Sequence, residues 1–265
     1  MKIATFAMAV LLAGTVGAMA AGQLTLSGAS YVQNFDSLSS GMPTGWSVNT
    51  GATVSAIGIT LEGTALATLV IPEGTTKTNT WGSSTAAFKN LASATNFLAG
   101  TGLTNGTAAS VQEAATDRAL GIRQTATFGD PGASFMLTLA NTTNLSNFTL
   151  SFDFEMLSVQ GRSTTWTVDY RKGGSGSFTS LGTIGDSGTF GVTNYLYSFG
   201  NVLDDYNGLV EIRMVTFTAA PGSGSRDTMA IDEFKLTYDV IPEPSTLLLA
   251  LMGLATCAVG LRRRW

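Results

Sequence analysis

The chain has 265 residues, of which 12% are charged, 31 are glycine and none is histidine. The lack of histidine excludes Ser-His-Asp triads, Cys-His dyads, histidine-containing zinc sites and histidine acid–base catalysis, but it leaves carboxylate chemistry open. The net charge is −4, and four of the 14 basic residues lie in the two terminal segments, so the central part is more acidic than the whole. An acidic chain without a basic run is a poor match for nucleic acid, and no nucleic-acid partner is expected.

The N-terminal segment predicts export. Lys2 provides a positive charge, residues 3–16 form an apolar run, and Ala18-Met19-Ala20 is a small-x-small cleavage site. These are the features of a secretory signal peptide. We therefore predict that residues 1–20 are a signal peptide, that Ala18 and Ala20 define the cleavage site, and that the Sec translocon is a partner.

Residues 21–239 contain no obvious repeat or linker and are interpreted as one domain. The clearest strand is Asn147 to Met156, where Phe148, Leu150, Phe152, Phe154 and Met156 alternate with polar residues. Such period-two alternation indicates a half-buried strand of an antiparallel sheet. Further strands are expected at 133–139, 165–171, 209–218 and 231–238, with Gly/Ser-rich turns such as 171–177 between them.

This pattern predicts an all-β fold, an antiparallel β-sandwich of the jelly-roll type. Residues 76–116 are less regular. Within them, the Ala-rich stretch Ser84–Ala94 is interpreted as a short helix on the sandwich or as a loop.

Two carboxylates in the clearest strand raise the question of catalysis. Asp153 and Glu155 share one face at about 6.5–7 Å, a spacing compatible with inverting glycoside hydrolysis. The alternative is a solvent-facing acidic surface that prevents edge-to-edge association. The second interpretation is preferred, because no neighbour in the sequence raises the pKa of either carboxyl.

Asp36 and Asp232 are candidate ligands of a calcium ion. Asp36 ends the first strand-like stretch and Asp232 begins the last one, and sandwiches often bring their first and last strands together. Ca²⁺ takes six to eight oxygen ligands, which two carboxylates and nearby carbonyls can supply. Turn capping and surface charge are the alternative explanation.

Trp46 and Trp81 lie in polar, Gly/Thr-rich surroundings and are candidate glycan contacts, since exposed indole faces stack on sugar rings. The alternative is that each closes one end of the sandwich core. Trp166, in an alternating strand, is expected in the core.

The C-terminal segment, residues 240–265, predicts a membrane anchor. Thr246 to Leu261 carries no charge and is followed by Arg262, Arg263 and Arg264. The run is slightly shorter than the ~20 residues of a typical transmembrane helix, a deficit that snorkelling arginines and local thinning of the bilayer can absorb. The arginines should remain cytoplasmic, which places the body outside the inner membrane. The only cysteine, Cys257, lies in this run, so no intramolecular disulfide can form.

Pro242, Glu243 and Pro244, followed by an apolar run and an arginine cluster, resemble the PEP-CTERM sorting signal of Gram-negative bacteria. The resemblance implies that an exosortase recognises Pro242-Glu243-Pro244, that Arg262 to Arg264 retain the precursor in the membrane, and that the protein then reaches the cell surface or matrix. Such substrates are commonly linked to exopolysaccharide and biofilm.

Several short stretches of the body, such as Arg118–Gly121 and Ile231–Phe234, resemble lectin-like or carbohydrate-binding-like sandwich modules of secreted bacterial proteins. We therefore expect a non-enzymatic exported protein that is structural or associated with exopolysaccharide. A carbohydrate-binding module with specific glycan recognition is the alternative, and a carboxylate hydrolase is less favoured.

Overall fold

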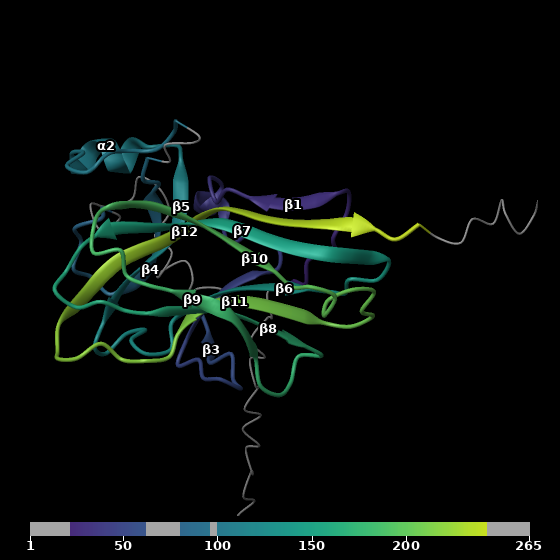
Figure 1. The fold of residues 1–265 in the computed structure, drawn as a ribbon. Coiled ribbons are helices and arrows are strands. Elements are labelled where there is room, and N and C mark those ends of the chain that lie inside the picture. The colour runs from purple at the N-terminus through teal and green to yellow at the C-terminus, as the bar shows by residue number, and fades with distance from the viewer. Residues whose placement is uncertain (1–21, 62–79, 96–99, 243–265) are drawn as a thin grey trace, which may run out of the picture.

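The computed structural model describes residues 22–61, 80–95 and 100–242, which form two antiparallel sheets packed face to face (Figure 1). Sheet I contains, in spatial order, β10 (Gly191–Ser198), β7 (Leu145–Ser158), β12 (Ser225–Val240), β5 (Arg118–Thr125) and β4 (Ala87–Ala92), and β1 (Ser30–Gln33) also pairs with β12. Sheet II contains β3 (Ile59–Thr60), β2 (Trp46–Thr50), β6 (Ser134–Leu139), β11 (Val210–Thr216), β8 (Trp166–Lys172) and β9 (Thr179–Ile184). The predicted antiparallel β-sandwich is confirmed.

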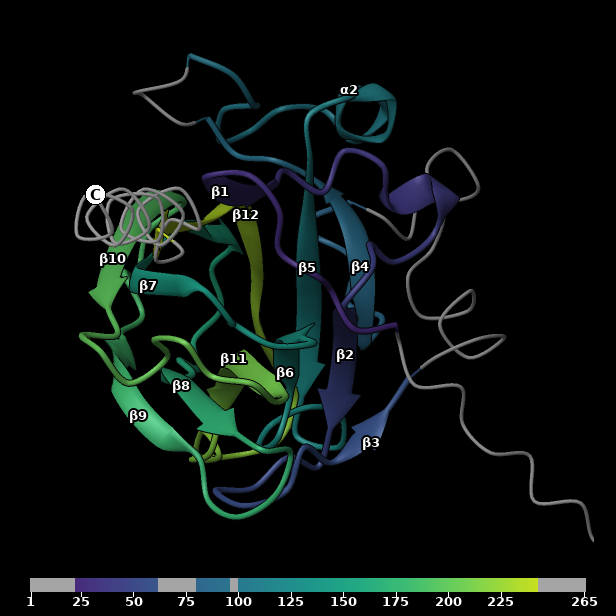
Figure 2. The same ribbon diagram turned by 90° about the vertical axis from the view of Figure 1, so that its right-hand side faces the viewer.

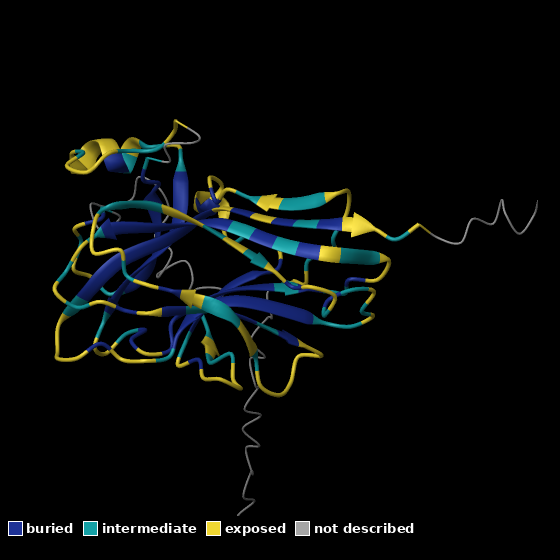
Figure 3. Ribbon diagram, viewed as in Figure 1, coloured by how far each residue is buried: buried dark blue, intermediate teal, exposed yellow. Residues whose placement is uncertain are grey.

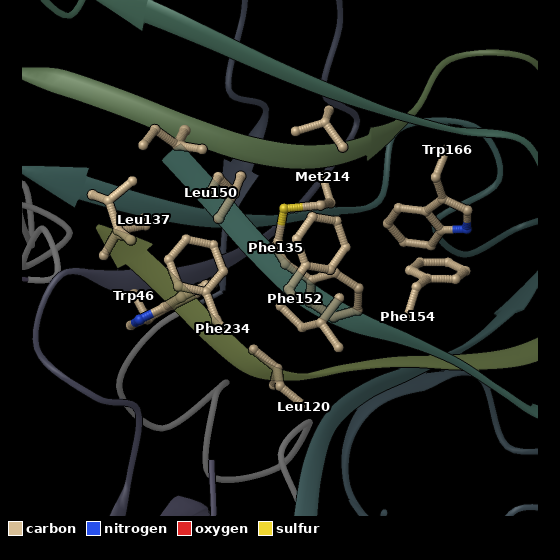
Figure 4. Packing of buried hydrophobic residues seen from close by; sticks show 14 of the residues in the cluster. Trp46, Leu120, Phe135, Leu137, Leu150, Phe152, Phe154, Trp166, Met214 and Phe234 are labelled. Carbon is tan, nitrogen blue, oxygen red and sulfur yellow. The ribbon is translucent and has the colours of Figure 1, made fainter. Parts of the chain in front are cut away.

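The core lies between the two sheets, and the alternating pattern predicted its largest contribution. Phe148, Leu150, Phe152, Phe154 and Met156 of β7 all belong to the main cluster of buried hydrophobic residues. Phe154 of β7 in sheet I contacts Trp166 of β8 in sheet II edge to face, with ring centroids 5.9 Å apart and planes 62° apart (Figure 4). The aromatic side chains thus join the two sheets directly.

The prediction of a helix or loop at Ser84–Ala94 is wrong. Ala87–Ala92 forms the edge strand β4, which pairs with β5 in the register Lys89↔Gly121. All six residues of β4 are buried, so the strand shows no alternation of exposed and buried residues. Tertiary burial on both faces has overridden the helical preference of an alanine-rich stretch.

A second layer covers part of the outer face of sheet I. Arg118 anchors it, because its guanidinium donates to the Asn90 side chain and to the carbonyl oxygens of Gln112 and Asn90 at 2.7–2.8 Å. The short helix α2 (Ala109–Ala114) belongs to this layer and lies beyond the start of β5 (Figure 2). A smaller apolar cluster fills the space beneath it, made of Trp81, Leu91, Ala92, Ala94, Ala119, Leu157 and Ala230.

The first and last strands are neighbours, as predicted. β1 pairs with β12 in the register Ser30↔Thr237 to Gln33↔Phe234. After β1, the chain forms a single 3₁₀ turn, η1 (Leu38–Ser40). Most strands are buried over much of their length, whereas the connecting turns are exposed (Figure 3).

Replacing Phe152 by Ala should lower the free energy of unfolding by about 3–5 kcal/mol, because a fully buried ring is removed from the centre of the core. Leu196→Ala is the control: Leu196 is 69% exposed on the neighbouring strand β10 and should change stability by less than about 0.5 kcal/mol. Denaturant unfolding followed by tryptophan fluorescence measures both. Equal effects of the two substitutions would contradict the assignment of the core.

Candidate functional site

The predicted sorting motif begins where the sandwich ends. β12 pairs with β7 up to Val240↔Leu145, and the backbone N–H of Ile241 then donates to the carbonyl oxygen of Asn144 at 2.8 Å. Pro242, the next residue, is exposed. The motif therefore follows the last backbone hydrogen bond of the body directly, without an intervening linker.

The remaining predicted residues of the two ends lie outside the described residues. These are Ala18 and Ala20 of the cleavage site, Glu243 and Pro244 of the motif, and Arg262, Arg263 and Arg264. The same holds for the expected spanning segment from Thr246 to Leu261. Within residues 22–61, 80–95 and 100–242, none of the helices combines the length and apolar character needed to cross a bilayer.

Of the two interpretations of Trp46, the structure supports burial in the core and not a glycan contact. Its side chain is fully buried, with edge-to-face contacts to Phe35 and Phe234 at centroid distances of 4.9 and 4.8 Å. The indole N–H donates to the Tyr31 hydroxyl at 2.8 Å, so the only polar atom of the ring is satisfied inside the core. Trp46 therefore closes the core and has no face available to a sugar.

Trp81 is also mostly buried, at 4% exposure, in the smaller apolar cluster outside sheet I. Its indole N–H donates to the Ala92 carbonyl oxygen at 2.8 Å, and its backbone N–H to Gln112 Oε1 at 2.9 Å. The expected free indole face is absent here too, but Trp81 does line a cavity together with Phe190.

An acidic cluster lies on the outer side of sheet I. Asp36, Asp117 and Glu233 line a pocket of about 690 Å³, with Thr101, Gly102 and Thr116 as its other walls. Three further carboxyl groups are almost completely buried beside it: Asp153, Glu155 and Asp232 are 1–2% exposed. We call these six residues the acidic cluster.

Glu155 and Asp232 form the centre of the acidic cluster. Glu155 accepts hydrogen bonds from Ser93 Oγ at 2.6 Å and from the Ala94 backbone N–H at 3.1 Å. Burial raises the pKa of Glu155 to about 8 and that of Asp232 to about 10, and mutual repulsion of the carboxylates adds to the shift of the Asp232 pKa. The two groups titrate as a pair, which keeps at least one proton at neutral pH.

The expectation of a solvent-facing acidic surface at Asp153 and Glu155 is wrong. Both side chains do point away from the main core, but the segment around Ser93 and Ala94 covers Glu155, and Asn194 Nδ2 donates to Asp153 Oδ1 at 2.8 Å. Neither carboxyl group is among the described residues that line the acidic pocket or the Trp81 cavity. A general acid must reach its substrate, so this burial gives the hydrolase hypothesis no support.

The two candidate calcium ligands lie in the same region but do not form a preformed metal site. Asp36 lines the acidic pocket and already accepts from the Arg118 backbone N–H at 2.8 Å, whereas Asp232 is buried. In the described parts of the chain, no three carboxylate, cysteine or histidine side chains are arranged to hold one ion. The donor chemistry suits Ca²⁺, but two carboxylates alone leave most of its coordination sphere to other oxygens.

Sequence reasoning missed Ser93, which lies in the irregular region of residues 76–116, and Asp117, which directly follows that region. It also missed the special conformation of Glu233, which has φ = 47° at a register shift between Asp232 and Lys235. The only sequence signal was the adjacent pair Asp232-Glu233 in an otherwise alternating strand. Burial raises the pKa of Glu233, and nearby Asp153 and Asp117 raise it further.

The tail is matched by a sequence family. The profile of the PEP-CTERM protein-sorting motif matches residues 240–264, from the last residue of β12 through the arginine cluster. The chain carries a PEP-CTERM sorting motif. It is therefore an exported, membrane-anchored precursor that an exosortase recognises through this motif. No curated protein sequence matches the chain.

Several solved structures have a similar sheet arrangement at low sequence identity. A xylan-binding module, CBM15, is 9% identical with a TM-score of 0.41, and the match covers 81% of this chain and all of the module. The C-terminal family 22 carbohydrate-binding module of a Clostridium thermocellum protein is 12% identical with a TM-score of 0.39, covering 78% and 91% of the two chains. At these scores, the ligands of those modules are not assigned to this chain.

The protein should be more stable at about pH 5 than at about pH 9. Because the folded pKa of Glu155 is raised to about 8 and that of Asp232 to about 10, stability present at low pH is lost as the pH rises through about 8. Asp232→Asn should remove most of this loss and raise the melting temperature at about pH 9, with little effect at pH 5. Asp239→Asn, an exposed carboxylate of the same strand, is the control. A melting temperature of the parent that does not change between these pH values would contradict the raised pKa values.

The calcium hypothesis predicts a higher melting temperature in Ca²⁺ than in EDTA. The difference should grow from about pH 6 to pH 9, since the cation and protons compete for the same oxygens. Asp36→Asn should abolish the difference if Asp36 is a ligand. Identical melting temperatures with Ca²⁺ and with EDTA at every pH would remove the hypothesis.

Proposed function

We propose that this protein is a non-enzymatic β-sandwich component that exosortase-type sorting delivers to the cell surface or extracellular matrix of a Gram-negative bacterium. There it serves as a structural or exopolysaccharide-associated protein. The observation that carries the proposal is the direct passage from β12 into the sorting motif, with Ile241 hydrogen-bonded to the body and Pro242 exposed.

The chemistry of the body supports a non-enzymatic role. The sequence has no histidine, so the common nucleophile–base pairs are lacking. The two carboxylates with hydrolase-like spacing are engaged by Ser93, Ala94 and Asn194. Their burial makes them part of the packing of the outer layer.

The architecture also suits a processed protein. β12 hydrogen-bonds to β7, β5 and β1, so cleavage within β12 would detach part of a strand in the middle of sheet I. Cleavage after Ile241 leaves every backbone hydrogen bond of β12 intact. We expect the mature protein to end C-terminal to Ile241 and to retain the complete sandwich.

Specific glycan recognition is a second candidate function. One observation favours it: Trp81 and Phe190 line a cavity that also contains amide and hydroxyl side chains. Binding of this kind is compatible with delivery to the surface.

Replacing Pro242, Glu243 and Pro244 together by Ala should abolish exosortase-dependent processing in a strain that has the enzyme. The reason is that proline keeps the segment extended and accessible, which alanine does not. Mass spectrometry of the mature C-terminus measures the result. Pro221→Ala, at an exposed turn of the body, is the matched control.

Two outcomes would contradict the proposed sorting. One is the same mature C-terminus in strains with and without the exosortase. The other is normal processing of the triple-alanine variant.

A further inference from the structure

A cavity of about 390 Å³ lies outside sheet I, beside the smaller apolar cluster. Trp81 and Phe190 contribute apolar walls, Asn105 and Gln112 come from the segment that contains α2, and Ser158 is the last residue of β7. Small-ligand sites commonly have volumes of ~300–1,000 Å³ and combine aromatic walls with a few polar groups. The size and composition of this cavity fall within that description.

The aromatic wall is held in a fixed position. The rings of Trp81 and Phe190 have centroids 4.9 Å apart and planes inclined at 50°. The Gln112 side chain fixes the geometry from both ends: its Oε1 accepts from the Trp81 backbone N–H, and its Nε2 donates to the Thr107 carbonyl oxygen at 2.8 Å. Gln112 is thus a positioning residue, and a ligand would meet a wall that needs little reorganisation.

Polar groups at the cavity remain able to bond a ligand. Ser158 Oγ accepts from Gln160 Nε2 at 3.1 Å and from Arg123 Nη1 at 3.4 Å. Because both contacts use its lone pairs, the hydroxyl hydrogen of Ser158 is left to donate to a ligand oxygen. Asn105 is exposed at the edge of the cavity and offers an amide with two donors and an acceptor.

The charge of the lining selects the chemical class of ligand. None of the described residues that line the cavity is ionisable as an acid or a base. Arg123, which donates to Ser158 from behind the lining, is buried and interacts with the carboxylate of Asp227. An anion would therefore lose hydration for little counter-charge, and a cation would gain none from the lining. A purely apolar ligand would leave the polar groups of the lining unpaired. A neutral molecule with an apolar face and several hydroxyl groups satisfies both requirements.

We propose that the Trp81–Phe190 cavity binds one neutral sugar residue of a glycan chain, with its C–H face on the half-buried ring of Phe190, which Trp81 supports from behind, and its hydroxyls on Ser158 and Asn105. This inference rests on the second candidate function above and names its site and ligand class. The sorting route does not depend on it.

The test is a titration of the full-length chain in a detergent that has no sugar headgroup. The probes are neutral oligosaccharides of glucose, galactose, mannose and xylose, with oligoglucuronate as the charged probe. Calorimetry and tryptophan fluorescence report binding. At least one neutral probe should bind saturably, and at least tenfold more tightly than oligoglucuronate.

Two variants and two matched controls locate the site. Asn105→Ala, at an exposed position, and Phe190→Leu should each weaken binding about tenfold. Asn207→Ala and Phe217→Leu make the same types of change away from the cavity and should leave binding unchanged. Melting temperatures show whether each variant is folded, and Asn105→Ala keeps the test valid if Phe190→Leu is destabilised.

Three outcomes would overturn the proposal: no saturable binding of any neutral probe, tighter binding of oligoglucuronate, or binding that neither Asn105→Ala nor Phe190→Leu weakens. The last of these would place glycan recognition elsewhere on the protein. These outcomes concern glycan binding alone. A failure of the proposed sorting would instead appear in the mass of the mature C-terminus, so the two failures can be distinguished.

Discussion

The pairing of β12 is the constraint on which the rest of the molecule depends. This strand lies between β7 and β5, and its C-terminal half also pairs with β1. Its inner side supplies Met229, Ile231, Phe234 and Leu236 to the core. Residues 231 and 234 are three apart and would face opposite sides of a regular strand. The irregularity at Glu233 turns both side chains inward, and it also brings Glu233 to the acidic pocket.

The outer face of sheet I shows how a chain with few charges uses the ones it has. Covering this face with a second layer buries Arg118 in a network of neutral acceptors and buries Glu155 and Asp232 together. A buried guanidinium with all its bonds satisfied ties the layer to β4. The carboxyl pair has the opposite effect at high pH, because ionising both groups places like charges in a poorly solvated space. Protons are therefore part of what holds this layer in place.

The parts of the fold that could be predicted are those where apolar and polar residues alternate in the sequence, even where the folded strand is buried on both faces, as β11 is. β7 and β8 were found because their buried and polar residues alternate, and Trp166 was placed in the core for the same reason. β4 and β5 were not recognised as strands, because the second layer buries their outer faces and removes the alternation.

Of the candidate functional residues, those that are contiguous in the sequence could be predicted and those that only the fold brings together could not. The sorting motif was predictable because a processing enzyme reads a short, contiguous stretch of sequence. The sequence left open whether Trp46 and Trp81 are exposed or buried, because the acceptors of their indole N–H groups, Tyr31 and Ala92, lie 15 and 11 residues away. The acidic cluster required residues from four separate segments, and only the folded chain brings them together.

Hydrogen exchange along the last strand of the full-length precursor tests the central claim, that the body is rigid up to the residue before the sorting motif. The account predicts that the amide of Ile241, bonded to Asn144, is protected to nearly the same degree as those of Leu236 and Tyr238. Rapid exchange from Leu236 through Ile241 would contradict it, because the motif would then follow a frayed segment instead of the end of a central strand.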